Sequence, residues 1–307
     1  MKIGVTGGTG FIGQYLLKEY SGENEFVVIT SRGSCEDLYI NSNIEYITGN
    51  YNQDEFEKCF IDCDAVVHLG AKRSSKESEE SIMNYLENLR VSEELFKACL
   101  KLKIKNIVNI SSTAVYDTTL QIPFDERLAV APLSNYGAMK HAIEGVAHLF
   151  NRKYGMNIKS LRLAQVMGVG ERGGYMLTIF QQRCLEQEPL NVYGKGIAGR
   201  EYIYVKDVVR AIMCAIYSRT ETEVFNVGNG VLTSNLELAQ AFCKVFENKA
   251  GYQCLTEKTE VIEHYLMTGK VAKKELGFEP KYTLEEALCD MKGILEKNNE
   301  TVEIEKK

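Results

Sequence analysis

Histidine is scarce in this chain, with four residues among 307, and its nine cysteines are scattered rather than clustered. A structural zinc site needs paired cysteine or histidine ligands at close spacing, and Cys59 and Cys63 have no partner cluster nearby. We therefore expect no metal site. Several cysteines fall on apolar helical stripes, which is typical of small buried side chains in a reducing compartment rather than of disulfides.

Long apolar runs and basic blocks are also missing. No apolar stretch reaches the length that a membrane-spanning helix needs. The net charge is −6 and no lysine- or arginine-rich block is present, so a nucleic-acid surface is unexpected. The chain starts directly on a predicted strand, which leaves no room for a secretory signal peptide. These absences predict a cytoplasmic protein with neither a nucleic-acid nor a membrane partner.

The N-terminal segment carries a glycine-rich loop between a strand and a helix. Residues 2–5 suit a buried parallel strand, and residues 11–20 form an amphipathic helix. Between them, Gly7, Gly10 and Gly13 recur at three-residue spacing. Glycine allows a tight turn, close approach of a pyrophosphate and close packing of the helix, whose N-terminal N–H groups attract phosphate. In this position the pattern predicts a dinucleotide-binding site.

Strand and helix patterns alternate over the first two-thirds of the chain. Strands separated by helices of this length imply a parallel sheet covered on both faces. We therefore expect an α/β fold with a doubly wound parallel sheet. The predicted strands are residues 2–5, 26–30, 44–48, 65–69, 104–110, 159–163 and 224–227, and the predicted helices between them are residues 11–20, 54–60, 78–100, 134–154 and 207–217.

The regular alternation ends near Gly168, where glycines cluster and shorter strands begin. Residues 1–167 are predicted to form the dinucleotide-binding domain, and residues 206–228 to return to its sheet. Residues 168–205 and 229–307 are predicted to form a smaller lobe of mixed α/β structure that binds the substrate. No low-complexity linker separates the two lobes, so we expect them to pack together.

Three side chains form a candidate catalytic group. Tyr136 and Lys140 are four residues apart on a predicted helix, so they project from the same side. Ser112 follows the predicted strand 104–110, and ligands of open parallel sheets bind beyond the carboxyl ends of the strands. An adjacent ammonium favours the phenolate and lowers the pKa of a tyrosine. The serine can bond an alcohol or carbonyl oxygen while the tyrosine moves a proton and a nicotinamide moves a hydride.

Six segments in order along the chain carry a resemblance to a known family. The sequence resembles the extended short-chain dehydrogenase/reductase family, in its nucleotide-sugar epimerase/dehydratase/reductase branch, over nearly its whole length. The resemblance implies a Rossmann-type domain that binds NAD or NADP and a C-terminal lobe that binds a nucleoside-diphosphate sugar. The segments are TGGTGFIG (6–13), HLGA (68–71), SSTAVY (111–116), YGAMK (136–140), LRLAQVMG (161–168) and REYIYVKDV (200–208).

The resemblance also assigns roles to residues of the matching segments. Ser112, Tyr136 and Lys140 are implied to be the catalytic group, with Lys140 also bonding the nicotinamide ribose. The cofactor is expected to contact Gly7, Gly10, Phe11, Ile12, Gly13, Ser31, Arg32, Asn50, Tyr51, Leu69, Gly70 and Ala71, together with Tyr136 and Lys140. The substrate is expected to contact Asn88, Ser112, Thr113, Gln165 and Arg200.

The end of the second predicted strand departs from the pattern of NAD-specific members. Those members usually carry an acidic residue there for the ribose hydroxyls, whereas this chain has Ser31 followed by Arg32. A guanidinium pairs well with phosphate oxygens, such as those of a 2′-phosphate. We therefore expect NADP rather than NAD, with NAD as the alternative.

A second departure concerns the residues after Ser112. Sugar 4,6-dehydratases of the family have an acidic residue followed by Glu or Gln there, for the elimination of water. This chain has Thr113 and Ala114, which cannot supply acid–base chemistry, so a dehydratase is not expected.

Two enzymatic hypotheses and one non-enzymatic hypothesis follow. The first is NADPH-dependent reduction of a nucleotide-linked 4-keto-6-deoxyhexose by hydride transfer at C4. The alternative is a 4-epimerase of a UDP-hexose or UDP-N-acetylhexosamine. A non-catalytic sensor of NAD(P) is disfavoured because Tyr136 and Lys140 are both present. The resemblance further implies a homodimer through the predicted helices 78–100 and 134–154.

Overall fold

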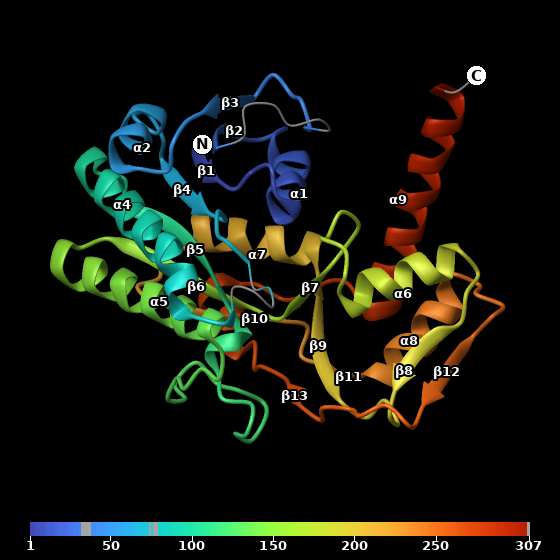
Figure 1. Ribbon diagram of the computed structural model, residues 1–307. Helices are drawn as coiled ribbons and strands as arrows, with labels where there is room; N and C mark the ends of the chain where they lie inside the picture. Colours follow the sequence, from blue (N-terminus) through green and yellow to red (C-terminus); the bar gives the residue numbers. More distant parts are fainter. Residues whose placement is uncertain (32–37, 74, 76–78, 306–307) are drawn as a thin grey trace.

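The structure is a computed structural model that describes residues 1–31, 38–73, 75 and 79–305, the side chains of 298–305 excepted. A seven-stranded sheet forms the larger part, and two smaller sheets lie in the C-terminal part (Figure 1). Every pair of neighbouring strands in the large sheet is parallel, in the order β10-β6-β5-β4-β1-β2-β3. The strands are β1 (Lys2–Thr6), β2 (Glu25–Thr30), β3 (Ile44–Thr48), β4 (Ala65–His68), β5 (Asn106–Ser112), β6 (Asn157–Leu163) and β10 (Val224–Val227).

Helices cover both faces of this sheet, which confirms the predicted doubly wound architecture. Strand side chains alternate between the faces, so Val28 packs with Leu16 and Val208 in one core, and Val27 packs with Phe96 in the other. The first face carries α1 (Phe11–Tyr20) and α7 (Val205–Tyr217), and the second carries α2 (Gln53–Cys59), α4 (Leu86–Leu102) and α5 (Asn135–Tyr154).

Strand β5 differs from its prediction in a way that matters for the site. It begins at Asn106 and continues to Ser112, where it pairs with Leu163 of β6. The two serines predicted to follow the strand therefore form its last two residues. Their backbone is fixed by the sheet, which gives Ser112 a more rigid placement than a loop would.

Helix α5 begins and ends as its sequence predicts. The side chain of Ser134 accepts the N–H of Gly137 at 3.0 Å, which satisfies one unpaired donor of the first turn. The helix ends at Gly155, whose φ of +63° lies in the left-handed region. The helix predicted over 78–100 instead starts as a short 3₁₀ turn, η1 (Ile82–Tyr85), before α4 begins. Residue 78, the first residue of that prediction, lies outside the described residues.

The C-terminal part contains smaller sheets of mixed direction. In one sheet β9 (Gly199–Tyr204) pairs antiparallel with β11 (Leu232–Ser234) and parallel with β13 (His264–Tyr265) and β7 (Gln165–Met167). The second sheet pairs β8 (Leu190–Tyr193) with β12 (Tyr252–Leu255). The helical elements of this part are α6 (Met176–Leu185), α8 (Asn235–Val245), the π-helical turn η3 (Ala272–Leu276) and α9 (Leu284–Glu305).

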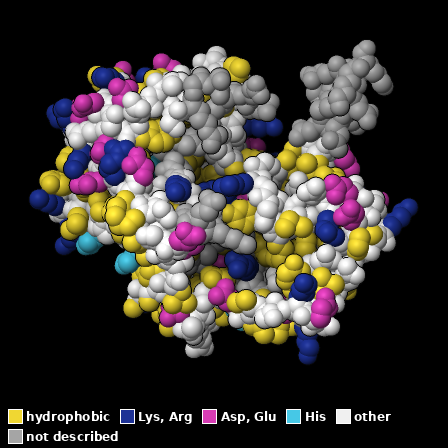
Figure 2. Space-filling model, in the orientation of Figure 1, with side chains coloured by type: hydrophobic (Ala, Val, Ile, Leu, Met, Phe, Trp, Pro, Cys, Tyr) yellow, Lys and Arg dark blue, Asp and Glu magenta, His cyan; other side chains and the backbone are white. Residues whose placement is uncertain are grey.

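Basic and acidic side chains are mixed on the surface over α2 and α4 (Figure 2). Arg90, for example, contacts both Glu87 and Glu94. Among the described helices, none is both long enough and apolar enough to cross a lipid bilayer. The described residues also contain no group of three or more potential metal ligands, and their eight cysteines are free thiols.

Lys159 is buried on β6, the strand next to the edge strand β10 of the large sheet. Its Nζ donates a 3.1 Å hydrogen bond to Oδ1 of Asn106, and burial lowers the pKa of the lysine from 10.5 to about 8. A lysine whose folded pKa lies below its unfolded value destabilises the fold when it is charged. The free energy of unfolding should therefore fall as the pH drops from 10.5 to about 8.

Replacing Lys159 by methionine should thus stabilise the protein at neutral pH. We expect Lys159→Met to raise the free energy of unfolding by about 2 kcal/mol at pH 7, and by much less at pH 10. Urea unfolding of both proteins at the two pH values measures this difference. An equal difference at both pH values would show that the charge of the lysine is not the cause.

Candidate active site

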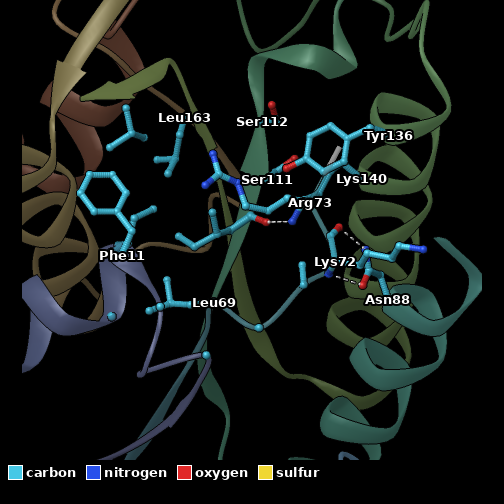
Figure 3. A pocket seen from close by; sticks show the side chains of 18 of the residues that line it. Phe11, Leu69, Lys72, Arg73, Asn88, Ser111, Ser112, Tyr136, Lys140 and Leu163 are labelled. Carbon is cyan, nitrogen blue, oxygen red and sulfur yellow. Dashed lines mark hydrogen bonds between the residues drawn. The ribbon is translucent and has the colours of Figure 1, made fainter. Parts of the chain in front are cut away.

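A cavity of about 620 Å³ opens at the carboxyl edge of the large sheet (Figure 3). Its volume lies in the range of small-molecule sites. Segments that follow β1, β4 and β5 line it together with α5 and the start of β7. It brings together most of the predicted site residues: Gly7, Gly10, Phe11, Ile12, Gly13, Ser31, Tyr51, Leu69, Gly70, Ala71, Asn88, Ser112, Thr113, Tyr136, Lys140 and Gln165.

The glycine loop at one end of the cavity fits a pyrophosphate. Gly7 has a φ of +71°, and a Cβ there would lie 2.6 Å from the backbone N of Gly70. A Cβ on Gly13 would lie 2.5 Å from Cα of Gly8. Gly10 caps α1 without a side chain bonded to the first N–H groups. The first turn of α1 therefore presents backbone donors and the positive end of the helix dipole to an anion.

The three predicted catalytic side chains lie at the other end of the cavity (Figure 3). Nζ of Lys140 lies 5.8 Å from the ring centroid of Tyr136 and donates a 2.7 Å hydrogen bond to the carbonyl oxygen of Ile110. Oγ of Ser112 accepts the N–H of Ala114 at 3.1 Å, so its hydroxyl hydrogen can be donated elsewhere. The arrangement places a phenol, an ammonium and a hydroxyl around one space.

The pKa of Tyr136 is raised in the structure, whereas the sequence predicts that it is lowered. Burial raises the pKa of Tyr136 to about 12, and the guanidinium of Arg73 acts in the opposite direction. Burial also lowers the pKa of Lys140 to about 8, against the effect of the Glu144 carboxylate. The ammonium of Lys140 is directed to the Ile110 carbonyl, and its predicted effect on the pKa of Tyr136 stays a prediction. Arg73 is a cation that lowers the pKa of Tyr136 and so favours the phenolate.

Asn88 lines the cavity, and both the oxygen and the nitrogen of its side-chain amide are hydrogen-bonded to the backbone of Lys72. Oδ1 accepts the Lys72 N–H at 2.7 Å, and Nδ2 donates to the Lys72 carbonyl at 2.9 Å. Asn88 thus fixes the segment after β4 and holds the neighbouring Arg73 in position. A direct contact of Asn88 with substrate stays a prediction.

Two of the predicted site residues that the structure describes, Arg200 and Asn50, do not line the cavity. Arg200 is exposed on β9, where its Cζ lies 4.9 Å from the Tyr265 ring and its Nη2 lies 3.9 Å from Oε2 of Glu263. Asn50 is exposed beside the cavity residue Tyr51. Arg32 lies outside the described residues. The expected contacts of Arg32 and Asn50 with the cofactor and of Arg200 with the substrate stay predictions.

A model of the NAD dependent epimerase/dehydratase family matches residues 3–228, which is more than half of the chain. The chain belongs to this family. The match confirms the resemblance derived from the sequence motifs, and it indicates that the protein is an enzyme of the epimerase/dehydratase type.

Solved structures with the same fold include two 4-epimerases. The UDP-glucose 4-epimerase of Thermotoga maritima, in complex with UDP-glucose, has a TM-score of 0.87 and 27% identity, and the match covers 97% of this chain and 99% of that chain. The UDP-N-acetylglucosamine 4-epimerase of Bacillus cereus has a TM-score of 0.84 and 29% identity, with 95% of each chain covered.

A dehydratase is also similar to this family member. The dTDP-glucose 4,6-dehydratase of Streptomyces niveus is 26% identical, over 94% of this chain and 91% of that protein. The family therefore includes more than one reaction, and the choice between them depends on side chains in the cavity.

Sequence reasoning missed the charged side chains of the cavity other than Lys140, among them Arg73 and Glu171. Arg73 follows the HLGA segment, and Nη2 of Arg73 donates a 2.8 Å hydrogen bond to Oε1 of Glu171. Tyr175 also lines the cavity, with its ring centroid 5.5 Å from Cζ of Arg73. The position of Arg73 just beyond the carboxyl end of β4 could have predicted its place in the site. No such indication exists for Glu171, because it lies in an irregular glycine-rich segment.

Proposed function

We propose that the protein is a 4-epimerase of a UDP-hexose or UDP-N-acetylhexosamine, with NAD as its resident cofactor. The observation that carries the proposal is that Tyr136, Lys140 and Ser112 share one cavity with the glycine loop. Two solved 4-epimerases that match nearly the whole chain support the choice of reaction. The nucleotide and the sugar are taken from the substrates in the names of those proteins.

The side chains after Ser112 argue against the dehydratase reaction. Thr113 lines the cavity, and its Oγ1 is buried without a hydrogen-bond partner among the described residues. Thr113 and Ala114 carry no carboxyl group, so neither can remove or return a proton at C5 or C6 of a hexose. A 4-epimerase oxidises and reduces the sugar at C4 alone, so it needs no carboxyl group at these positions.

The 4-ketoreductase, our first expectation from the sequence, is not retained as the main proposal. Its main support was Arg32 as a ligand of the NADP 2′-phosphate, and this residue lies outside the described part of the chain. The family description specifies NAD, and the relatives described above are epimerases and a dehydratase. We therefore propose NAD, not NADP, as the cofactor.

The glycine loop would hold the pyrophosphate of NAD, and Tyr136 and Lys140 would lie at its nicotinamide end. When bound, NAD supplies a ring that accepts and returns a hydride and is positively charged in its oxidised form. Tyr136 would take the proton from the C4 hydroxyl and later return it to the oxygen at C4. Ser112 would donate its hydroxyl hydrogen to that oxygen, and Arg73 would stabilise the phenolate.

The test is whether the protein interconverts epimers without added nicotinamide. Purified protein is incubated with UDP-glucose or UDP-N-acetylglucosamine, and the anomeric proton signals are followed by NMR. We expect the galacto epimer to appear until equilibrium, with no net change in absorbance at 340 nm. If no epimer forms, and NADPH is instead consumed in equal amount with a nucleotide-linked 4-keto-6-deoxyhexose, the reductase is correct and the epimerase proposal fails.

We also propose that the protein is a homodimer through α4 and α5. Leu149 on α5 is exposed, as are Leu86 at the start of α4 and Met83 just before it. These apolar side chains on the outer surface of the two helices support a protein contact there. Light scattering should then report twice the mass of one chain, and a single-chain mass would reject the dimer.

A further inference from the structure

Arg73 and Glu171 meet in the cavity from different parts of the fold. Arg73 follows β4 of the large sheet, whereas Glu171 lies between β7 and α6, and both line the cavity with Tyr136. Nη2 of Arg73 and Oε1 of Glu171 are 2.8 Å apart. Figure 3 shows Arg73 within the pocket beside Tyr136. The ion pair therefore stands next to the phenol that would move the proton.

One oxygen of the Glu171 carboxylate lacks a donor. The side chain is 2% exposed, and its Oε2 is buried without a hydrogen-bond partner among the described residues. An ionised carboxylate accepts several hydrogen bonds, and a buried acceptor left without one is unfavourable. Burial raises the pKa of Glu171, while Arg73 acts in the opposite direction. The wall of the cavity thus contains a covered acceptor that a bound molecule can satisfy after a small local movement.

We propose that Oε2 of Glu171 accepts a hydrogen bond from a hydroxyl or amide N–H of the sugar, and that this contact selects neutral hexoses and N-acetylhexosamines over uronates. The inference rests on the proposed function, because it takes the ligand to be a nucleotide sugar whose ring lies at Tyr136. It goes further by assigning a residue that determines which sugar is accepted.

The chemistry of the two sugar classes explains the selection. Neutral sugars carry hydroxyl groups, and N-acetylhexosamines also an amide N–H, which can donate to Oε2 of Glu171. A uronate keeps its ring hydroxyls but carries a carboxylate at C6, which only accepts hydrogen bonds and whose charge would face a second carboxylate. The positive charge of Arg73 is already matched by Glu171, so it offers a uronate less attraction than an unpaired guanidinium would.

The backbone around Glu171 allows the contact to form. Oε2 is covered by protein atoms, so the sugar reaches it only if the segment or the side chain moves slightly. Gly170 and Gly174 have φ values of +90° and +95°, and a Cβ at Gly174 would meet nothing within 4 Å. Such glycines permit backbone rearrangement that other residues would resist.

The experiment compares the contribution of the sugar to binding in matched variants. Calorimetry on the NAD-loaded protein measures the affinities for UDP, UDP-glucose, UDP-N-acetylglucosamine and UDP-glucuronic acid. Wild type should bind the better neutral sugar at least tenfold more tightly than the uronate. In Glu171→Leu the affinity for the neutral sugars should fall about tenfold, and that for the uronate should rise, because Arg73 loses its partner.

Two further variants separate selection from a structural role. Glu171→Gln keeps an acceptor oxygen and should give an intermediate preference. Glu188→Gln is the control for loss of a carboxylate outside the cavity. Oε2 of Glu188 lies 3.7 Å from Nη1 of Arg183, and the substitution should change none of the four affinities. Affinity for UDP itself should be the same in all variants, whereas a merely structural role of Glu171 would lower it.

The outcomes for the two proposals are independent. If wild type prefers the uronate, or if Glu171→Leu leaves the ratio of UDP-sugar to UDP affinity unchanged, the role of Glu171 is rejected. If the ratio of UDP-sugar to UDP affinity depends on Glu171 but wild type forms no epimer by NMR, the epimerase proposal is rejected and the contact of Glu171 with the sugar is retained.

Discussion

Replacing Tyr136 by phenylalanine should reduce kcat for epimerisation by a factor of about 10³, within the range for loss of a general acid–base group. The ring remains and keeps its packing on Tyr85, with centroids 5.9 Å apart, but the hydroxyl that exchanges the proton is lost. The glycine loop is untouched, so affinity for NAD should stay within a factor of two or so. NMR of the UDP-sugar measures turnover, and calorimetry with NAD measures binding.

A second tyrosine on α5 provides the control. Tyr154 is exposed near the last turn of the helix, and Tyr154→Phe should leave both kcat and NAD binding unchanged. Turnover of Tyr136→Phe at the wild-type rate would remove Tyr136 from the mechanism. A loss of NAD binding together with turnover would indicate a disturbed pocket rather than a missing proton carrier.

Replacing Gly137 by alanine should damage both stability and turnover. A Cβ at this position would lie 2.0 Å from the carbonyl oxygen of Ala114 and 2.9 Å from Cβ of Pro132. Helix α5 must then move away from the segment that follows Ser112. We expect the free energy of unfolding to fall by about 3 kcal/mol and kcat to fall about 100-fold, because Tyr136 moves relative to Ser112.

The matched substitution is Gly293→Ala in the middle of α9. A Cβ there would meet nothing within 4 Å, so alanine should stabilise that helix by about 0.5–1 kcal/mol and leave kcat unchanged. Denaturant unfolding and turnover of both variants make the comparison. Wild-type stability in Gly137→Ala would mean that α5 does not need the close approach to Ala114.

Local patterns were enough to predict the doubly wound sheet. The apolar runs of β2 and β3 and the glycine loop before α1 lie where the sequence places them, because each depends on residues near one another in the chain. The return of residues 224–227 to the large sheet was also predicted, and β10 pairs with β6. The grouping of Ser112, Tyr136 and Lys140 followed from helix spacing and from the rule for strand ends.

Electrostatic relations between distant residues were not predictable in the same way. The pKa of Tyr136 depends on burial and on Arg73, which is 63 positions earlier in the chain. Arg73 in turn depends on Glu171, nearly 100 positions later. Arg200 was assigned to the substrate from its motif alone, and the structure places it outside the cavity. Sequence spacing gives no information on such pairs until the fold is known.

Strand β10 has a consequence for how the molecule can be divided. The chain leaves the large sheet after β6, builds part of the smaller sheets, and comes back at residues 224–227 to complete the ladder beside β6. A fragment that stops at residue 167 would lack α7 and would expose the backbone of β6 as an open sheet margin. Such a fragment should aggregate when expressed alone, whereas the intact chain should unfold as one cooperative unit.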